Sequence, residues 1–221
     1  MEQGEQAWKD AFPGLVSYSR FVELMPSVVL PLFGFLLRRI GKCTGIAFAD
    51  STTLSVCHPK RIKPHKVFAA VAQRGKSSRG WFFGFKLHLI VNECGQLLAF
   101  WLTSGNTDDR QPIPQMTRGL SGKLFADKGY RSQPLFEDLF QQGLQLVTPL
   151  RKNMANRLIP LLDKLRLRKR SIIETINDQL KNIQQTDHSR HRSHSIFLVN
   201  LLEGLLPYTF QPKKPSVSLA P

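Results

Sequence analysis

Three carboxylates, Asp50, Asp127 and Glu174, stand in sequence contexts that could bring them together. Asp50 ends the apolar run GIAFAD and Asp127 ends the apolar run KLFAD, while Glu174 belongs to a charged, helix-like stretch. Carboxylates that lie close together repel one another unless a cation sits between them. Carboxylate oxygens are also the ligands that hard divalent cations prefer. The residue types therefore suit a site for divalent metal ions, provided that the fold assembles them.

Each acid also has a plainer interpretation. Asp127 could simply cap the turn that follows its apolar run. Glu174 could form a surface ion pair with Arg170 one helical turn before it, which contributes about 0.3–0.5 kcal/mol. Asp178 is a second acid on the same expected helix, and the acids of the SGNTDDR turn (104–110) could cap that turn or support the metals.

The apolar runs predict the elements that must position these acids. Strands are expected at 45–50, 81–91, 97–103, 123–127 and 144–150, and helices up to about 119 and at 132–143, 157–183 and 194–206. The order βββαβαβα allows an antiparallel hairpin followed by parallel crossovers. It predicts an α/β fold with a mixed five-stranded sheet flanked by helices, the order of the RNase H-like fold. The ends of the first and fourth strands, with Asp50 and Asp127, would then meet at one edge.

The expected helix at 157–183 must bring Glu174 to that edge. Its apolar residues form one stripe that would face the sheet, namely Ile173, Ile176, Leu180 and Ile183. Arg170, Glu174 and Lys181 fall on an adjacent polar face. A single acid between two basic residues suits a site that handles phosphate groups.

The chain is strongly basic, with 31 Lys and Arg against 16 Asp and Glu and a net charge of +15. Residues 51–90 contain eight basic residues and no acid. Such an imbalance favours a polyanionic partner, because basic side chains that neutralise phosphates release condensed counterions. The stretch RGKSSRG (74–80) is interpreted as a flexible basic loop that could follow a phosphate backbone.

The remaining composition predicts a cytoplasmic protein with no membrane contact. Three scattered cysteines form no CxxC pair, and the first residues do not resemble a signal peptide. The most apolar run (24–37) has only 14 residues with two prolines, whereas a membrane span needs about 20. We expect three regions: a helical N-terminal region at 1–44, an α/β domain at 45–210 and a disordered tail at 211–221.

Three motifs in this order resemble the DDE transposases of bacterial insertion sequences. They are FADST (48–52), FADKGY (125–130) and the R-x3-E-x6-K spacing of Arg170, Glu174 and Lys181. The family signature is Y-x2-R-x3-E-x6-K, and Leu167 stands here at the tyrosine position. The stretches 58–68, 74–91 and 102–110 are also similar to the family, so that the likeness runs from roughly residue 11 to 215.

The resemblance implies a function and a set of site residues. Residues 1–44 would be a helical remnant of a DNA-binding region, and residues 45–210 would be the RNase H-like catalytic domain. Asp50, Asp127 and Glu174 would be the catalytic acids and would bind two Mg²⁺ or Mn²⁺ ions. The implied reactions are hydrolysis at an insertion-sequence end and attack of the freed 3′-OH on target DNA. The partner would be double-stranded DNA, with a homodimer as one arrangement of the complex. The expected DNA contacts are Lys66, Arg74, Lys76, Arg79, Lys86, Lys128, Arg131, Arg170 and Lys181.

Two other interpretations remain open from the sequence. One is an RNase H-like nuclease that performs no strand transfer. The other is a truncated, non-catalytic DNA-binding remnant, because only 49 residues precede Asp50 and related transposases usually carry a longer N-terminal DNA-binding region.

Overall fold

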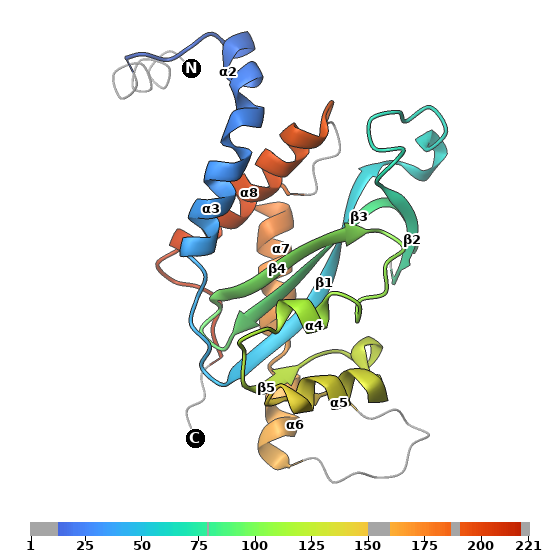
Figure 1. Cartoon of the computed structure of the whole chain (residues 1–221), viewed down its shortest axis with the longest axis vertical. Coiled ribbons are helices and arrows are strands. Elements are labelled where there is room, and N and C mark those ends of the chain that lie inside the picture. Colours follow the sequence, from blue (N-terminus) through green and yellow to red (C-terminus); the bar gives the residue numbers. More distant parts are fainter. Residues whose placement is uncertain (1–12, 79, 150–159, 187–190, 218–221) are drawn as a thin grey trace.

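A mixed six-stranded sheet forms the centre of the protein (Figure 1). The computed structural model describes residues 13–78, 80–149, 160–186 and 191–217. The strands are β1 (Ile46–Cys57), β2 (Gln73–Ser77), β3 (Gly80–Asn92), β4 (Leu97–Ser104), β5 (Gly122–Phe125) and β6 (Leu144–Val147). Their order is β2-β3-β1-β5-β6, and β4 also pairs with β3.

The directions of the strands confirm the predicted mixture. β3 is antiparallel to β1 and to β4, whereas β5 is parallel to β1 and to β6. The parallel pairing of β1 with β5 is short, from Ile46–Phe48 on β1 to Lys123–Phe125 on β5. Both parallel strands are therefore tied to the antiparallel hairpins through β1 alone.

The prediction of a flexible loop at 74–80 was wrong, because β2 pairs with the start of β3 over most of this stretch. Gly75 of this strand lies very close to the backbone at Gly105. A Cβ atom at position 75 would lie 2.1 Å from the carbonyl oxygen of Gly105. The course of β2 therefore includes a close backbone contact with a residue 30 positions away in the sequence.

Helices cover both faces of the sheet. They are α2 (Tyr18–Leu24), α3 (Val29–Arg38), α4 (Ile113–Met116), α5 (Gln133–Gln141), α6 (Leu161–Arg168), α7 (Ser171–Asn182) and α8 (His194–Phe210), with 3₁₀ turns η1 (Met25–Val28), η2 (Pro59–Arg61) and η3 (Lys128–Tyr130). Helix α5 begins at the predicted cap, where the side chain of Ser132 accepts from the amide of Leu135. Helix α8 continues past the predicted end at 206, through Pro207, because Tyr208 and Thr209 are buried.

The single helix expected at 157–183 was also wrong, since α6 and α7 are separate helices that meet at Lys169 and Arg170. Helix α6 is tied to β5 by an ion pair between Asp163 and Lys123 (2.6 Å), whereas α7 packs on the face of β1. One straight helix could not make both contacts. Residues 157–159 lie outside the described residues.

The stripe expected on this helix is correct except at its end. Ile173, Ile176 and Leu180 are buried, but Ile183 is exposed because α7 ends at Asn182. Ile172 is also buried on this face of α7.

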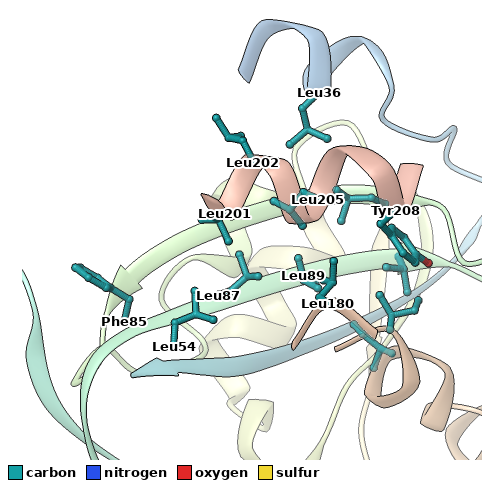
Figure 2. Close-up of a cluster of buried hydrophobic side chains, with 14 of the residues drawn as sticks. Leu36, Leu54, Phe85, Leu87, Leu89, Leu180, Leu201, Leu202, Leu205 and Tyr208 are labelled. Carbon is teal, nitrogen blue, oxygen red and sulfur yellow. The ribbon is translucent and has the colours of Figure 1, made fainter. Parts of the chain in front are cut away.

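Two apolar layers hold the sheet in place. Figure 2 shows the layer on one face, where Leu87 and Leu89 of β3 lie beneath Leu201 and Leu205 of α8, with Leu180 of α7 beside them. The opposite face packs against α4 and α5 through residues such as Ile113 and Leu139. Full burial of a Leu or Phe side chain stabilises the folded state by about 1.5–3 kcal/mol. These layers fix the strands and α7 as rigid supports.

An N-terminal arm, formed by α2, η1 and α3, extends away from the sheet (Figure 1). Its C-terminal part packs on the domain, because η1 and α3 both contact α8, with Leu36 buried and the ring of Phe35 stacked on Phe210. The helical run Tyr18–Arg38 has 21 residues, longer than the sequence suggested, and is long and apolar enough to cross a membrane by length and composition alone.

Candidate functional site

Asp50 lies inside β1 and does not end it, contrary to the prediction. The strand continues to Cys57 because its antiparallel pairing with β3 continues past Asp50. The parallel pairing with β5 nevertheless stops at Phe48, where β5 ends. Asp50 therefore lies two residues beyond the point at which β1 and β5 separate, at the expected edge of the sheet.

Asp127 lies at the same edge, two residues after β5. It precedes the 3₁₀ turn η3, but its side chain makes no capping hydrogen bond with that turn. The rings of Phe48 and Phe125, 5.6 Å apart, hold the two strand ends together beneath the acids. The turn that follows is anchored by buried Tyr130, whose pKa is raised well above its usual value by burial and by the nearby Asp50 carboxylate.

Arg170 joins all three predicted acids. Its guanidinium lies 3.8 Å from a carboxylate oxygen of Asp50, 3.8 Å from one of Asp127 and 2.8 Å from one of Glu174. The acids come from β1, from the segment after β5 and from the first turn of α7. The break between α6 and α7 places Arg170 just before that first turn. Three elements thus bring their carboxylates to one positive group.

The three acids differ in their exposure. The side chain of Asp50 is 21% exposed, whereas those of Asp127 and Glu174 are 52% and 56% exposed. Burial raises the pKa of Asp50 to about 6, and the opposing effect of Arg170 does not cancel this rise. A buried carboxylate with such a raised pKa lacks the nearby positive charge that would fully stabilise its ionised form at neutral pH. Asp50 is therefore the acid most affected by the arrival of a cation.

Asn177 is a site residue that the sequence analysis did not identify. Its side-chain amide donates a hydrogen bond of 3.1 Å to the second carboxylate oxygen of Asp50. Asn177 is buried on α7, three residues after Glu174, so one helix contacts two of the acids. The spacing of three residues was the available signal, because positions i and i+3 share a helical face. Asn177 holds Asp50 in a fixed orientation.

A polar groove of about 600 Å³ is lined by two of these acids, Asp50 and Glu174, but not by Asp127. It is lined by Asp50, Ser51, Thr52, Thr53, Ser77, Ser78, Ser171, Glu174, Thr175, Asn177, Asp178 and Lys181. Its walls are hydroxyl, amide and charged groups from β1, α7 and the turn between β2 and β3. Asp178 therefore lies in the groove, although Arg170 contacts Glu174 and not Asp178 among the described ion pairs. Such a lining can donate and accept hydrogen bonds along a polar chain molecule.

The residue types of this site suit divalent metal ions well, but their arrangement suits them only in part. Three carboxylates are hard oxygen donors that suit Mg²⁺ or Mn²⁺. Within the ranges that the structure describes, however, no three His, Cys, Asp or Glu side chains lie close enough together to hold a metal ion. The Arg170 guanidinium supplies positive charge between the acids instead. The acids are held at one place, but they are arranged around an arginine.

The expected DNA-contact residues occupy different environments. Lys66, Arg74, Lys76 and Lys128 are exposed, whereas Arg131, Arg170 and Lys181 are half-buried. Lys86 forms an ion pair of 2.9 Å with Asp109 and is largely buried. Arg79 lies outside the described residues.

Trp81 was also missed by the sequence analysis. The guanidinium of Arg74 lies 4.5 Å from the centre of its ring, and the Lys76 ammonium lies 5.8 Å away. The hairpin β2–β3 thus presents two cations and an exposed aromatic ring next to the groove. The position of Trp81 within a run of basic residues was the signal that could have pointed to it.

The fold is similar to that of a transposase of known structure. A chain of the piggyBac transposase synaptic complex with hairpin DNA is similar with a TM-score of 0.52 and 11% identity, over 90% of this chain and 56% of that chain. A chain of the simian T-cell lymphotropic virus intasome in complex with the PP2A regulatory subunit B56 gamma gives a TM-score of 0.39 and 12% identity, over 89% and 72% of the two chains. Together with the mixed sheet, the first likeness defines an RNase H-like α/β fold.

The family follows from the sequence of the whole region. The model of the Transposase DDE domain family matches residues 40–194, well over half of the chain. The protein therefore belongs to the DDE transposase family. No curated protein matches the sequence. The chain spans little more than half of the length of the piggyBac transposase chain.

Proposed function

We propose that this protein is a DNA transposase in which Asp50, Asp127 and Glu174 are the catalytic acids. The observation that carries the proposal is their convergence on the single guanidinium of Arg170 from three separate elements. Membership of the DDE transposase family supports a transposase-type function. The basic charge of the chain supports DNA as its partner.

The three acids would hold two Mg²⁺ or Mn²⁺ ions, which would activate the attacking oxygen and stabilise the leaving oxygen of a phosphodiester. Divalent metal ions are general in this family. Asn177 orients Asp50 through its hydrogen bond, so that the buried carboxylate keeps one position. The hydroxyl-lined groove seats a DNA strand beside the acids, and Lys181 at its wall lies where it can hold a phosphate.

The proposed reaction has two steps. A water molecule first attacks the phosphodiester at the element end, which frees a 3′-OH and leaves the 5′-phosphate on the flanking strand. The 3′-OH then attacks a phosphodiester of target DNA, so that one bond forms as another breaks. Two ends must be joined, and we place a homodimer on double-stranded DNA in the cytoplasm.

Single substitutions of the exposed acids test this assignment. Asp127→Asn and Glu174→Gln are each expected to reduce Mg²⁺-dependent cleavage of element-end DNA by at least about 10²–10³-fold, the size of loss when one preorganised electrostatic group is removed. Glu137→Gln, which changes an exposed acid of α5 outside the groove, is the control and should retain cleavage. Undiminished cleavage by either triad variant would sink the assignment of that residue.

A separate assay distinguishes a transposase from a nuclease. Pre-cleaved ends with free 3′-OH groups are mixed with target plasmid and Mg²⁺. Joined products are expected from the proposed transposase, whereas a nuclease of the same fold yields none. Salt-sensitive DNA binding without any metal-dependent cleavage would favour the non-catalytic remnant.

The basic hairpin is expected to contribute to the salt dependence of DNA binding. The double substitution Arg74→Ala/Lys76→Ala removes two exposed cations beside the groove. Because each phosphate contact contributes about 0.9 to the slope of log K against log salt, the slope should fall by about 1–2. Titrations of labelled duplex at several salt concentrations measure it. Arg118→Ala, which removes an exposed cation near α4, is the control, and an equal change there would refute a role of the hairpin.

A further inference from the structure

We propose that the N-terminal arm is a self-association surface that pairs, in antiparallel orientation, with the arm of a second copy of this chain. The arm (α2, η1 and α3) lies outside the residues that the family model matches. The proposal rests on the proposed function in one respect: it supplies the surface through which the proposed homodimer would form. Its evidence comes from the exposed apolar area, the charge and the shape of the arm.

The exposed apolar area of the arm has the size of a stable interface. The large exposed side chains of the arm are Tyr18, Phe21, Leu24, Val28, Leu30, Phe33, Phe35 and Leu37, and Leu15 and Val16 directly precede it. An aromatic side chain buries about 150–250 Å² and a Leu or Val side chain less, and these side chains are on average about half exposed, so together they offer on the order of 800 Å². A standard protein interface takes about 800 Å² from each partner. A monomer rarely leaves so much apolar surface in one patch.

The charge of the arm favours a second copy over other partners. The chain carries a net charge of +15, so two copies repel one another over most of their surfaces. Between residues 15 and 37 the only charged residues are Arg20 and Glu23, which pair with each other at 3.1 Å. With Arg38 at its C-terminal end, the arm carries a net charge of +1 on a chain of +15. It is a nearly neutral surface, where two copies can meet with little repulsion and which offers little to a polyanion.

The shape of the surface is complementary to itself. An apolar hollow of about 540 Å³ lies at the base of the arm, between α3, β4 and α8, with Phe33, Trp101 and Leu198 among its lining residues. The free end of the arm carries the exposed rings of Tyr18 and Phe21. At 1.5 Å per residue, the distance along the arm from Phe21 to Leu37 is about 24 Å.

Antiparallel pairing of two arms follows from this arrangement. The tip of each arm then reaches the base of the other, and one two-fold contact fills both hollows with the same side chains. Such a contact is isologous, the commonest form of association between identical chains. An unrelated partner would have to supply both a ring and a hollow at this spacing.

A membrane does not explain the surface equally well. The apolar patch continues from the arm onto Trp101 of β4 and Leu198 of α8, which belong to the folded domain. Leu36, at the base of the same helix, is fully buried against that domain. Although little of the run Tyr18–Arg38 is buried, a helix that spans a membrane would have to leave the domain surface that shares its apolar patch. A protein partner can cover the arm and that surface together.

The oligomeric state of the metal-free, DNA-free protein tests the proposal. Sedimentation equilibrium at micromolar concentration in detergent-free buffer should give a dimer for the wild type and a monomer for Phe21→Glu and for Leu37→Lys. Phe140→Glu is the matched control, because Phe140 is an equally exposed ring on α5, outside the arm. It should remain a dimer. Circular dichroism melts confirm that each variant is folded.

A mixing experiment tests the antiparallel register. In that register Phe21 of one copy lies opposite Leu37 of the other, so a mixture of the Phe21→Glu and Leu37→Lys proteins should restore a dimer that neither forms alone. A monomeric wild type, equal disruption by Phe140→Glu, binding to neutral phosphatidylcholine vesicles in place of self-association, or a dimer that forms only after deletion of residues 1–12 would each overturn the proposal. Asp127→Asn should dimerise like the wild type, so a failed catalytic assignment and a failed arm proposal give different results.

Discussion

Replacement of Asp50 by asparagine is expected to abolish DNA cleavage and at the same time to make the metal-free protein more stable at neutral pH. The first effect follows from the loss of a negatively charged metal ligand at the proposed site. The second follows from the cost of keeping a buried carboxylate charged. The side chain is 21% exposed, and burial raises its pKa from 3.8 to about 6.

The sign of the stability effect follows from proton binding. Between about pH 4 and pH 6 the folded protein holds the Asp50 proton more tightly than the unfolded chain does. The free energy of unfolding therefore falls as the pH rises through this window and stays low above it. A shift of about two pKa units corresponds to a cost on the order of 2–3 kcal/mol. An asparagine of nearly the same shape keeps a carbonyl oxygen for Asn177 and carries no charge.

Urea unfolding with EDTA at pH 4 and at pH 7.5 measures this difference. Asp50→Asn should be more stable than the wild type by up to about 2–3 kcal/mol at pH 7.5 and nearly equal to it at pH 4. Asp127→Asn, which changes a half-exposed acid, is the matched variant and should lose cleavage without a comparable gain in stability. Addition of Mg²⁺ should narrow the gap by stabilising only the wild type. A gain that is the same at both pH values would contradict the explanation from proton binding.

The positions of Asp50 and Asp127 could be predicted because each follows an apolar run that forms a buried strand. Phe48 and Phe125 are fully buried, and their contact sets the edge from which both acids project. The local pattern could not show that β1 continues past Asp50, since STTLSVC is polar on one side and its pairing partner on β3 is distant in sequence. Strand β2 was missed because RGKSSRG shows no alternation of apolar and polar residues, although its partner on β3 is only a few residues away.

The position of Arg170 could be predicted only in part. Helical spacing placed it one turn before Glu174, and the structure has that contact at 2.8 Å. A continuous helix would have kept Arg170 on a solvated face. The break at Lys169 and Arg170 separates α7 from α6, which Asp163 ties to Lys123 of β5, 40 positions away in the sequence. The contacts of Arg170 with Asp50 and Asp127 therefore depend on tertiary structure.

Replacement of Arg170 by alanine is expected to make the stability of the protein depend strongly on divalent metal. The variant leaves three carboxylates without the cation that now lies within 4 Å of each. Removal of one partner from a buried ion pair costs about 3–5 kcal/mol, but Asp127 and Glu174 are more than half exposed and screened by solvent. We expect a loss of about 1–3 kcal/mol at pH 8, mostly from Asp50, and recovery of part of it near pH 5, where Asp50 binds its proton.

Added Mg²⁺ distinguishes this explanation from a simple packing defect. A divalent cation can supply the positive charge that the guanidinium supplied, so Arg170→Ala should gain more in melting temperature from 10 mM Mg²⁺ than the wild type gains. Arg168→Ala, which removes an exposed arginine two residues earlier, should show neither the loss nor the larger gain. Differential scanning calorimetry with EDTA or Mg²⁺ at pH 5 and pH 8 measures both effects. If Arg170→Ala loses stability equally in all four conditions, the arginine acts through packing and not as the counter-charge of the three acids.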